Sequence, residues 1–151
     1  ACGYGVGHRR PPQVKVQGIN GRPHNIQIAD YLIDWSPKRE VSVPQGVVKA
    51  FLRPYWQSHV CCEELRIPGS RMRIDLVNLT RRIAIEVSPQ SSHSFNRVFH
   101  KNRIKFSAAG KRDLDKGEWC EMNGFTFVEI TDTDLPQLSK AWFLKHYDIT
   151  L

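Results

Sequence analysis

The sequence predicts a mixed α/β domain (α+β, with a mixed sheet) in the order helix, three strands, helix, strand, helix, preceded by a basic N-terminal extension. Three observations support this prediction. The chain has 151 residues, of which 40% are hydrophobic, so it can bury one substantial core. Three short runs of strand-type residues follow one another between tight turns. Stretches with helical spacing of apolar residues lie on either side of them.

Residues 1–40 are expected to form the extension, and residues 41–151 the main domain. The segment "VKVQGINGRPHNIQI" alternates apolar and polar residues around Asn20-Gly21, which predicts a β-hairpin. The extension is rich in Lys and Arg, so it is a candidate arm for gripping a phosphate backbone. The alternative is a solvated, loosely packed extension.

The first helix of the main domain is expected to begin after Ser42, which suits an N-cap, with Pro44 in the first turn. Apolar residues then recur at helical spacing as far as Trp56, and Pro54 should kink or end the helix. The runs "VCCEELRI", "RMRIDLVN" and "RRIAIEVS" predict three strands, and the short connections "PGS" and "LT" favour antiparallel neighbours.

The second half of the chain predicts a long helix, a strand and a closing helix. The long helix is expected from about Phe95 to Asn123, with an interruption near Gly110 and Gly124 as its C-terminal stop. "FTFVEIT" predicts the strand, and "LPQLSKAWFLKHY" predicts the closing helix.

The formal net charge of +7 favours a polyanionic partner, nucleic acid before an anionic membrane. No apolar run has the length of a membrane span, and the first residues do not resemble a secretory signal. The cysteines, which include the adjacent Cys61 and Cys62, have no disulfide-type spacing, so we expect thiols in a reducing compartment. Cys2 and His8 would supply at most two ligands of a zinc site, and an ordered or frayed arm is the alternative.

Asp75 and Glu86 lie in the second and third predicted strands, each within an apolar run. Side chains alternate along a strand, so pairing of these strands through "NLTRR" lets both carboxylates share one sheet face. Two adjacent carboxylates repel each other unless one is protonated or a cation lies between them. Mg²⁺ suits such oxygen ligands, so the pair predicts a metal site. The alternative is a cross-strand ion pair of Asp75 with Arg73 or Arg82.

Four stretches, "RIDLVN", "IAIEVSPQSSH", "KRDLDKGEWCEMNGF" and "FTFVEI", stand in an order that resembles a known superfamily. The chain looks like a PD-(D/E)XK nuclease with the restriction-endonuclease-like fold. The closer resemblance is to the very-short-patch-repair-like branch, which includes phage homing endonucleases described by an EDxHD motif. It covers roughly residues 42–135, so the first forty residues lie outside it.

The resemblance implies a role for several residues. Asp75 and Glu86 match the two ligands of a catalytic Mg²⁺, for which Mn²⁺ can substitute. His93 matches a histidine that can relay a proton or contact phosphate, and Asp113 matches an aspartate of the following helix. Apart from the resemblance, Lys116, Lys101 or Arg112 could supply the positive charge that stabilises the transition state.

The chain departs from the family pattern at two positions. Ser88 occupies the usual lysine slot, and Gln45 stands where the family often has a glutamate on the first helix. Gln45 can still hydrogen-bond a metal-bound water, but it carries no charge. Both departures suggest weakened activity.

The expected function is therefore divalent-metal-dependent endonucleolytic cleavage of double-stranded DNA, as in a homing-type nuclease. Mismatch repair, restriction, or a binding module that has lost catalysis are the alternatives. The protein is expected to act in the cytoplasm of a bacterial or phage-infected cell, and a homodimer is a possible assembly. Basic and polar side chains predicted to contact nucleic acid are Arg9, Arg10, Arg22, Arg71, Gln90, Arg97, Lys101, Lys105 and Arg112.

Overall fold

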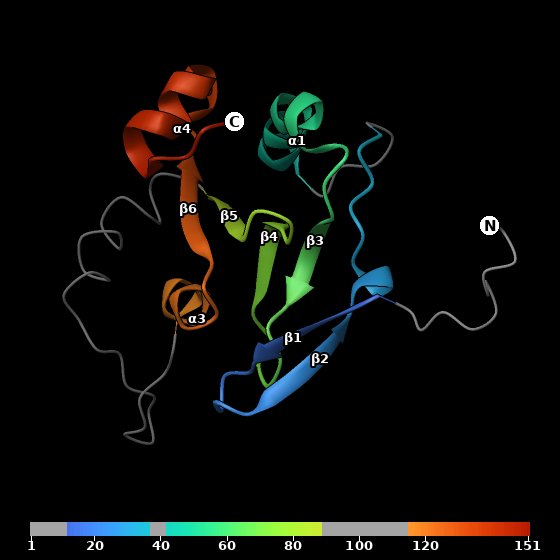
Figure 1. The fold of residues 1–151 in the computed structure, drawn as a ribbon. Coiled ribbons are helices and arrows are strands. Elements are labelled where there is room, and N and C mark those ends of the chain that lie inside the picture. Colours follow the sequence, from blue (N-terminus) through green and yellow to red (C-terminus); the bar gives the residue numbers. More distant parts are fainter. Residues whose placement is uncertain (1–11, 37–41, 89–114) are drawn as a thin grey trace, which may run out of the picture.

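The computed structural model describes residues 12–36, 42–88 and 115–151. Its centre is a four-stranded sheet with the strand order β3 (Cys61–Arg66), β4 (Arg73–Asn78), β5 (Ile83–Ser88) and β6 (Thr126–Thr131) (Figure 1). β3, β4 and β5 are antiparallel neighbours, whereas β6 pairs with β5 in parallel. The mixed sheet and the antiparallel arrangement of the first three strands confirm the sequence prediction at this level.

Helices cover both faces of the sheet. Ile85 of β5 packs in a core cluster with Leu52 of α1 (Val43–Trp56) and Phe143 of α4 (Lys140–Tyr147). The preceding residue, Ala84, belongs to a second cluster that contains Trp119 of α3 (Lys116–Met122). Because adjacent strand residues point to opposite faces, α1 and α4 cover one face and α3 covers the other. Among the described helices, none is long and apolar enough to cross a membrane.

Helix α1 begins and ends where the sequence predicts. The Ser42 hydroxyl accepts a hydrogen bond from the Gln45 amide at 3.2 Å, and Pro44 lies in the first turn, where a missing N–H has no cost. The helix ends two residues after Pro54. Its buried side chains follow helical spacing and form the stripe that faces the sheet: Gln45, Val48, Lys49, Leu52 and Trp56.

The predicted hairpin forms from β1 (Gln13–Gln17) and β2 (Pro23–Gln27), with Gly21 at φ 77° in its turn. Glycine accommodates this left-handed conformation without a steric cost. The hairpin is followed by a short 3₁₀ turn, η2 (Ile28–Asp30), and a single bridge between Leu32 and Cys62.

The hairpin contributes to the core. Val16 and Ile26 are buried in the cluster that contains Trp119, and the Trp119 indole N–H donates to the Gln17 carbonyl at 2.7 Å. The turn of the hairpin also contacts the β3–β4 turn, where the Ile19 amide donates to the Pro68 carbonyl at 2.9 Å. Residues 12–36 are therefore packed against the main domain and are not a loosely attached extension.

The second half of the chain differs from prediction in its helix boundaries. The described part of the predicted long helix is α3, which Asp115 and Glu118 start with a reciprocal capping box, and Gly124 follows its end at φ 75°. The closing helix begins at Lys140 and not near Leu135, because the Ser139 hydroxyl caps it. Leu135–Gln137 form a separate 3₁₀ turn, η3.

Candidate active site

Asp75 and Glu86 are adjacent on neighbouring strands. The β4–β5 ladder pairs Leu76 with Ile85, so the next position outward places Asp75 opposite Glu86, and their side chains hydrogen-bond to each other. The second oxygen of Asp75, Oδ2, accepts the Val87 amide at 2.8 Å. The prediction that the two carboxylates share a sheet face is confirmed.

The alternative ion pairs of Asp75 are not formed. Within the described residues, no salt bridge joins Asp75 to Arg73 or Arg82. The Arg82 guanidinium lies instead over the Phe125 ring, 5.4 Å from its centroid. Asp75 is therefore oriented by the backbone of β5 and by Glu86, and not by a neighbouring cation on its own strand pair.

Lys116, the first residue of α3, is the cation at this site. Its Nζ lies 2.7 Å from Oε2 of Glu86. The Glu86 side chain is 8% exposed, whereas that of Lys116 is 31% exposed, so the ammonium reaches in from the solvent-facing side of the pair. The capping box at Asp115 fixes where α3 begins and thereby fixes Lys116 over the sheet.

The surroundings of Glu86 favour its protonated form. Burial, the hydrogen bond with Asp75 and the negative charge of Asp75 together raise the pKa of Glu86 to about 8, while Lys116 acts in the opposite direction. Two carboxylates in contact carry more negative charge than one lysine neutralises. The pair therefore takes up a proton near neutral pH, or it can accept a further cation.

Two more carboxylates lie at the same level of the sheet, and sequence reasoning missed both. Glu129 of β6 is the register partner of Glu86. Glu64 of β3 lies opposite Asp75, between the paired residues Glu63–Leu76 and Leu65–Ile74. A row of four acidic residues, Glu64, Asp75, Glu86 and Glu129, thus crosses all four strands. Centring the β3–β4 hairpin on Gly69-Ser70 would have placed Glu64 opposite Asp75 from sequence.

A cavity of about 260 Å³ opens beside Glu86. Lys116 and Ser88 both line it. A lysine therefore lies on the same cavity as Ser88, the residue that the family resemblance matches to a lysine. The apolar part of its wall comes from Met72 and Phe127.

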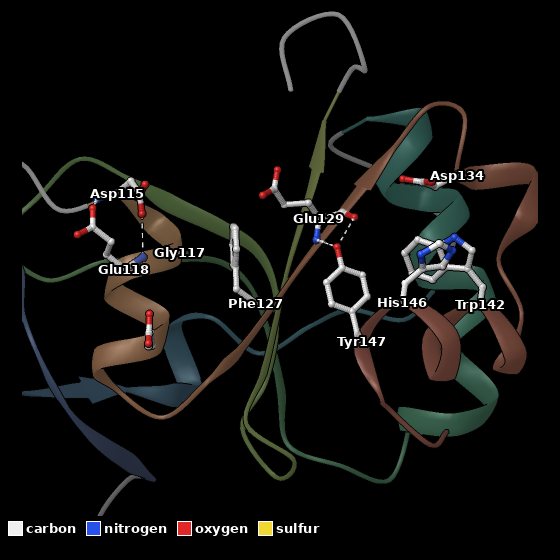
Figure 2. Close-up of a pocket in the computed structure, with 10 residues that line it drawn as sticks. Asp115, Gly117, Glu118, Phe127, Glu129, Asp134, Trp142, His146 and Tyr147 are labelled. Carbon is white, nitrogen blue, oxygen red and sulfur yellow. Dashed lines mark hydrogen bonds between the residues drawn. The ribbon is translucent and has the colours of Figure 1, made fainter. Parts of the chain in front are cut away.

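A second cavity of about 590 Å³ lies between α3 and α4, and it shares Gly117, Phe127 and Glu129 with the first. Figure 2 shows Phe127 and Glu129 of β6 between the two helices, with Tyr147, Trp142 and His146 on the α4 side. The Tyr147 hydroxyl donates to the Glu129 carbonyl at 3.2 Å and accepts from the Glu129 amide at 3.1 Å. These two backbone contacts fix β6 against α4.

The donor set at Asp75 and Glu86 fits Mg²⁺ better than a metal that needs a full protein cage. In the described ranges, no group of three or more His, Cys, Asp or Glu side chains converges closely enough to hold a metal ion. Mg²⁺ usually keeps several waters and takes one or two carboxylates from the protein. Two adjacent carboxylates with an open cavity beside them meet that requirement.

Gln45 is buried on α1, and its amide nitrogen, Nε2, has no hydrogen-bond partner among the residues that the structure describes. The helix packs against the face opposite to the one that carries Lys116, and Gln45 does not line the cavity beside Glu86. A catalytic role of Gln45 stays a prediction.

Two of the predicted nucleic-acid contacts lie in the described part of the chain. Arg22 is exposed in the β1–β2 turn and Arg71 in the β3–β4 turn. These turns touch through Ile19 and Pro68, so the two arginines belong to one end of the molecule.

The remaining predicted site residues lie outside the described residues. They are His93 and Asp113 of the catalytic set, Cys2 and His8 of the possible zinc site, and the predicted nucleic-acid contacts Arg9, Arg10, Gln90, Arg97, Lys101, Lys105 and Arg112.

Three cysteines, Cys61, Cys62 and Cys120, are buried free thiols. Burial raises their pKa values to about 12, 11 and 12, respectively, so they stay protonated and poorly nucleophilic at neutral pH. These cysteines act as small core residues.

Comparisons with known proteins give one weak relative to report. The chain is 30% identical over 67 residues to the uncharacterized protein 033L of Invertebrate iridescent virus 3. The match covers 44% of this chain and 34% of the viral protein, whose name assigns no activity. No protein-family model matches the chain, and no solved structure matches it.

Proposed function

We propose that this protein is a divalent-metal-dependent endonuclease that hydrolyses phosphodiester bonds of double-stranded DNA. The observation that carries the proposal is the contact between Asp75 and Glu86 on adjacent strands, with the ammonium of Lys116 on Glu86 and a cavity beside them. Carboxylates that share a strand end next to a lysine suit a site where a phosphate is attacked by water.

In this proposal, Asp75 and Glu86 hold Mg²⁺, or Mn²⁺ in its place. The metal, when bound, supplies charge neutralisation for the phosphate and lowers the pKa of a bound water. The Val87 amide holds Asp75 Oδ2 at 2.8 Å and so limits the orientations of that carboxylate. Glu86 must give up its proton to act as a ligand, because only the carboxylate binds the metal well.

Lys116 supplies the positive charge that Ser88 cannot. Both residues line the cavity beside Glu86, so an ammonium is available there although the strand itself carries a hydroxyl. A lysine at this position can stabilise the charge that develops on the phosphate in the transition state. His93 and Asp113 are proposed as a proton relay and a water-orienting group, respectively, as the family resemblance implies.

The biological role proposed is that of a homing-type nuclease with a restriction-endonuclease-like core, acting in the cytoplasm of a bacterial or phage-infected cell. A homodimer would supply a second active site for the opposite strand. The order of the four motif stretches, together with the order of the described elements, supports the restriction-endonuclease-like core within this proposal.

A plasmid assay tests the proposal. Supercoiled DNA incubated with the protein and Mg²⁺ should be nicked or linearised, and EDTA should stop the reaction. Asp75→Asn and Glu86→Gln should each abolish cleavage while DNA still shifts in a gel. The matched control is Asp30→Asn, an exposed acid in η2. Wild-type cleavage rates in both site variants would refute the proposal.

A binding module without catalysis is the second candidate, and one observation favours it. The Lys116 ammonium already neutralises Glu86 in part, as expected for a site that has settled into an ion pair. A module of this kind would shift the same plasmid in a gel and leave it intact at every Mg²⁺ or Mn²⁺ concentration.

A further inference from the structure

The β3–β4 ladder is interrupted at Glu64. Pairing is regular on both sides, at Glu63–Leu76 and Leu65–Ile74, but Glu64 and Asp75 do not pair although they lie opposite each other. Glu64 has φ 52°, a left-handed conformation in the middle of a strand. The β4–β5 ladder likewise stops at Leu76–Ile85, one position before Asp75. The sheet is therefore opened on both sides of Asp75.

No local contact explains why a glutamate occupies this position. A non-glycine residue at this φ is strained, and glycine would remove that strain. Within the described residues, the Glu64 side chain makes no hydrogen bond and no ion pair. Its partial burial and the negative charge of Asp75 raise the pKa of Glu64, while the charges of Arg73 and Lys116 act in the opposite direction and offset only part of this effect. The position thus combines strain, partial desolvation and like-charge repulsion, and strain of this kind collects at functional sites.

We propose that Glu64 is a positioning residue of the Asp75–Glu86 metal centre: from the neighbouring strand, its carboxylate accepts hydrogen bonds from the water ligands of the bound ion. This inference rests on the proposed function. A hydrated Mg²⁺ needs such acceptors, because most of its ligands are waters whose hydrogen atoms point outward. Residues that bind the ligands of a metal in this way typically alter its affinity about 10–100-fold when they are replaced.

The interruption of the ladder gives the geometric reason for this role. A regular strand at Glu64 would pair with Asp75 and make the β3–β4 ladder continuous. The left-handed residue instead leaves Asp75 unpaired on the β3 side, while the Asp75 carboxylate binds the Val87 amide on the β5 side. Glu64 therefore contributes in two ways: its backbone opens the sheet at Asp75, and its side chain supplies an acceptor there.

Two variants separate these contributions. Glu64→Gln keeps the size of the side chain and removes its charge, whereas Glu64→Gly removes the side chain and the strain together. Asp148→Asn is the matched control, because Asp148 is also an acidic residue with a left-handed backbone, at φ 57°, but it caps the C-terminus of α4. Binding of Mn²⁺ alone is measured by calorimetry on the full chain, and the melting temperature is measured without metal.

We expect Glu64→Gln and Glu64→Gly to weaken Mn²⁺ binding at least tenfold, without lowering the melting temperature. Asp148→Asn should leave Mn²⁺ affinity unchanged. Mn²⁺ affinity within twofold of wild type in both Glu64 variants would overturn the inference, while an Asp75- and Glu86-dependent site in the same experiment would leave the proposed function intact. A wild-type protein that binds no Mn²⁺ would refute the metal centre and the role of Glu64 with it. A fall in melting temperature with unchanged affinity would assign Glu64 to the fold alone.

Discussion

Lys116 Nζ lies 2.7 Å from Glu86 Oε2, although the two residues are separated by the whole segment between β5 and α3. The contact brings a lysine to β5, whose sequence "IAIEVS" has Ser88 where the family resemblance would place a lysine. It also explains how a largely buried carboxylate next to Asp75 is tolerated, because the ammonium offsets part of the negative charge.

Replacement of Lys116 should separate its chemical role from its structural one. Lys116→Met keeps much of the side-chain volume and removes the charge, so DNA cleavage should fall about 100-fold if the ammonium stabilises the transition state. Lys116→Arg should recover part of the rate. The control is Lys145→Met, an exposed lysine on α4. Single-turnover cleavage assays give the rates, and equal losses in the two methionine variants would contradict a specific role for Lys116.

The stability of the protein should depend on the protonation of Glu86. Folding raises the pKa of this carboxyl from an ordinary 4.5 to about 8, so the folded state holds its proton over a pH range where the unfolded state has lost it. The contribution of Glu86 to the free energy of unfolding should therefore fall as pH rises from about 4.5 to about 8. The slope is at most about 1.4 kcal/mol per pH unit.

Urea unfolding of wild type and of Glu86→Gln, measured from about pH 5 to about pH 9, checks this dependence. The glutamine variant cannot titrate at this position, so the difference in free energy of unfolding between the two proteins should grow in its favour as pH rises. A difference that is constant across the range would show that Glu86 has an ordinary pKa in the folded protein.

The two exposed arginines on adjacent turns should contribute to DNA binding without sequence preference. Arg22→Ala and Arg71→Ala should each weaken binding and reduce the slope of log affinity against log salt by about 0.9 for every phosphate contact that is lost. Lys145→Ala, on α4, serves as the control. Fluorescence anisotropy over a series of salt concentrations gives the slopes. An unchanged slope in the double variant would remove this end of the molecule from the DNA interface.

The N-terminal hairpin should depend on Asn123 for its attachment. Asn123 Oδ1 accepts the Gln17 amide at 2.7 Å, and Asn123 Nδ2 donates to the Gln17 carbonyl at 3.1 Å. Asn123→Ala should cost about 1 kcal/mol of stability. It should also speed hydrogen exchange in β1 and β2 more than in β6, whereas Asn25→Ala, an exposed change on β2, should do neither. Equal exchange in wild type and Asn123→Ala would show that the apolar contacts alone hold the hairpin.

The sequence by itself determined the strands, the first helix and the adjacency of Asp75 and Glu86, but not where the later helices begin. Alternation in "RMRIDLVN" and "RRIAIEVS", joined by a short turn, was enough to place Asp75 and Glu86 together, because side-chain direction along a strand has a period of two. Ser42 and Gly124 marked helix ends through the local chemistry of capping and of left-handed residues, which needs no knowledge of the rest of the fold. The position of the hairpin turn at Asn20-Gly21 followed for the same reason.

Only the tertiary structure decided which residues from distant segments meet at the site. The contact of Lys116 with Glu86 depends on how α3 packs on the sheet, and the pairing of Glu86 with Glu129 depends on the parallel register of β6. The interruption at Glu64 is a backbone conformation that a strand pattern does not predict for a glutamate. Likewise, the packing of α1 on one face of the sheet comes from contacts between Leu52 and Ile85, which are far apart in the chain. Each of these outcomes is set by contacts between segments far apart in the chain, whose energies appear only when the whole core is assembled.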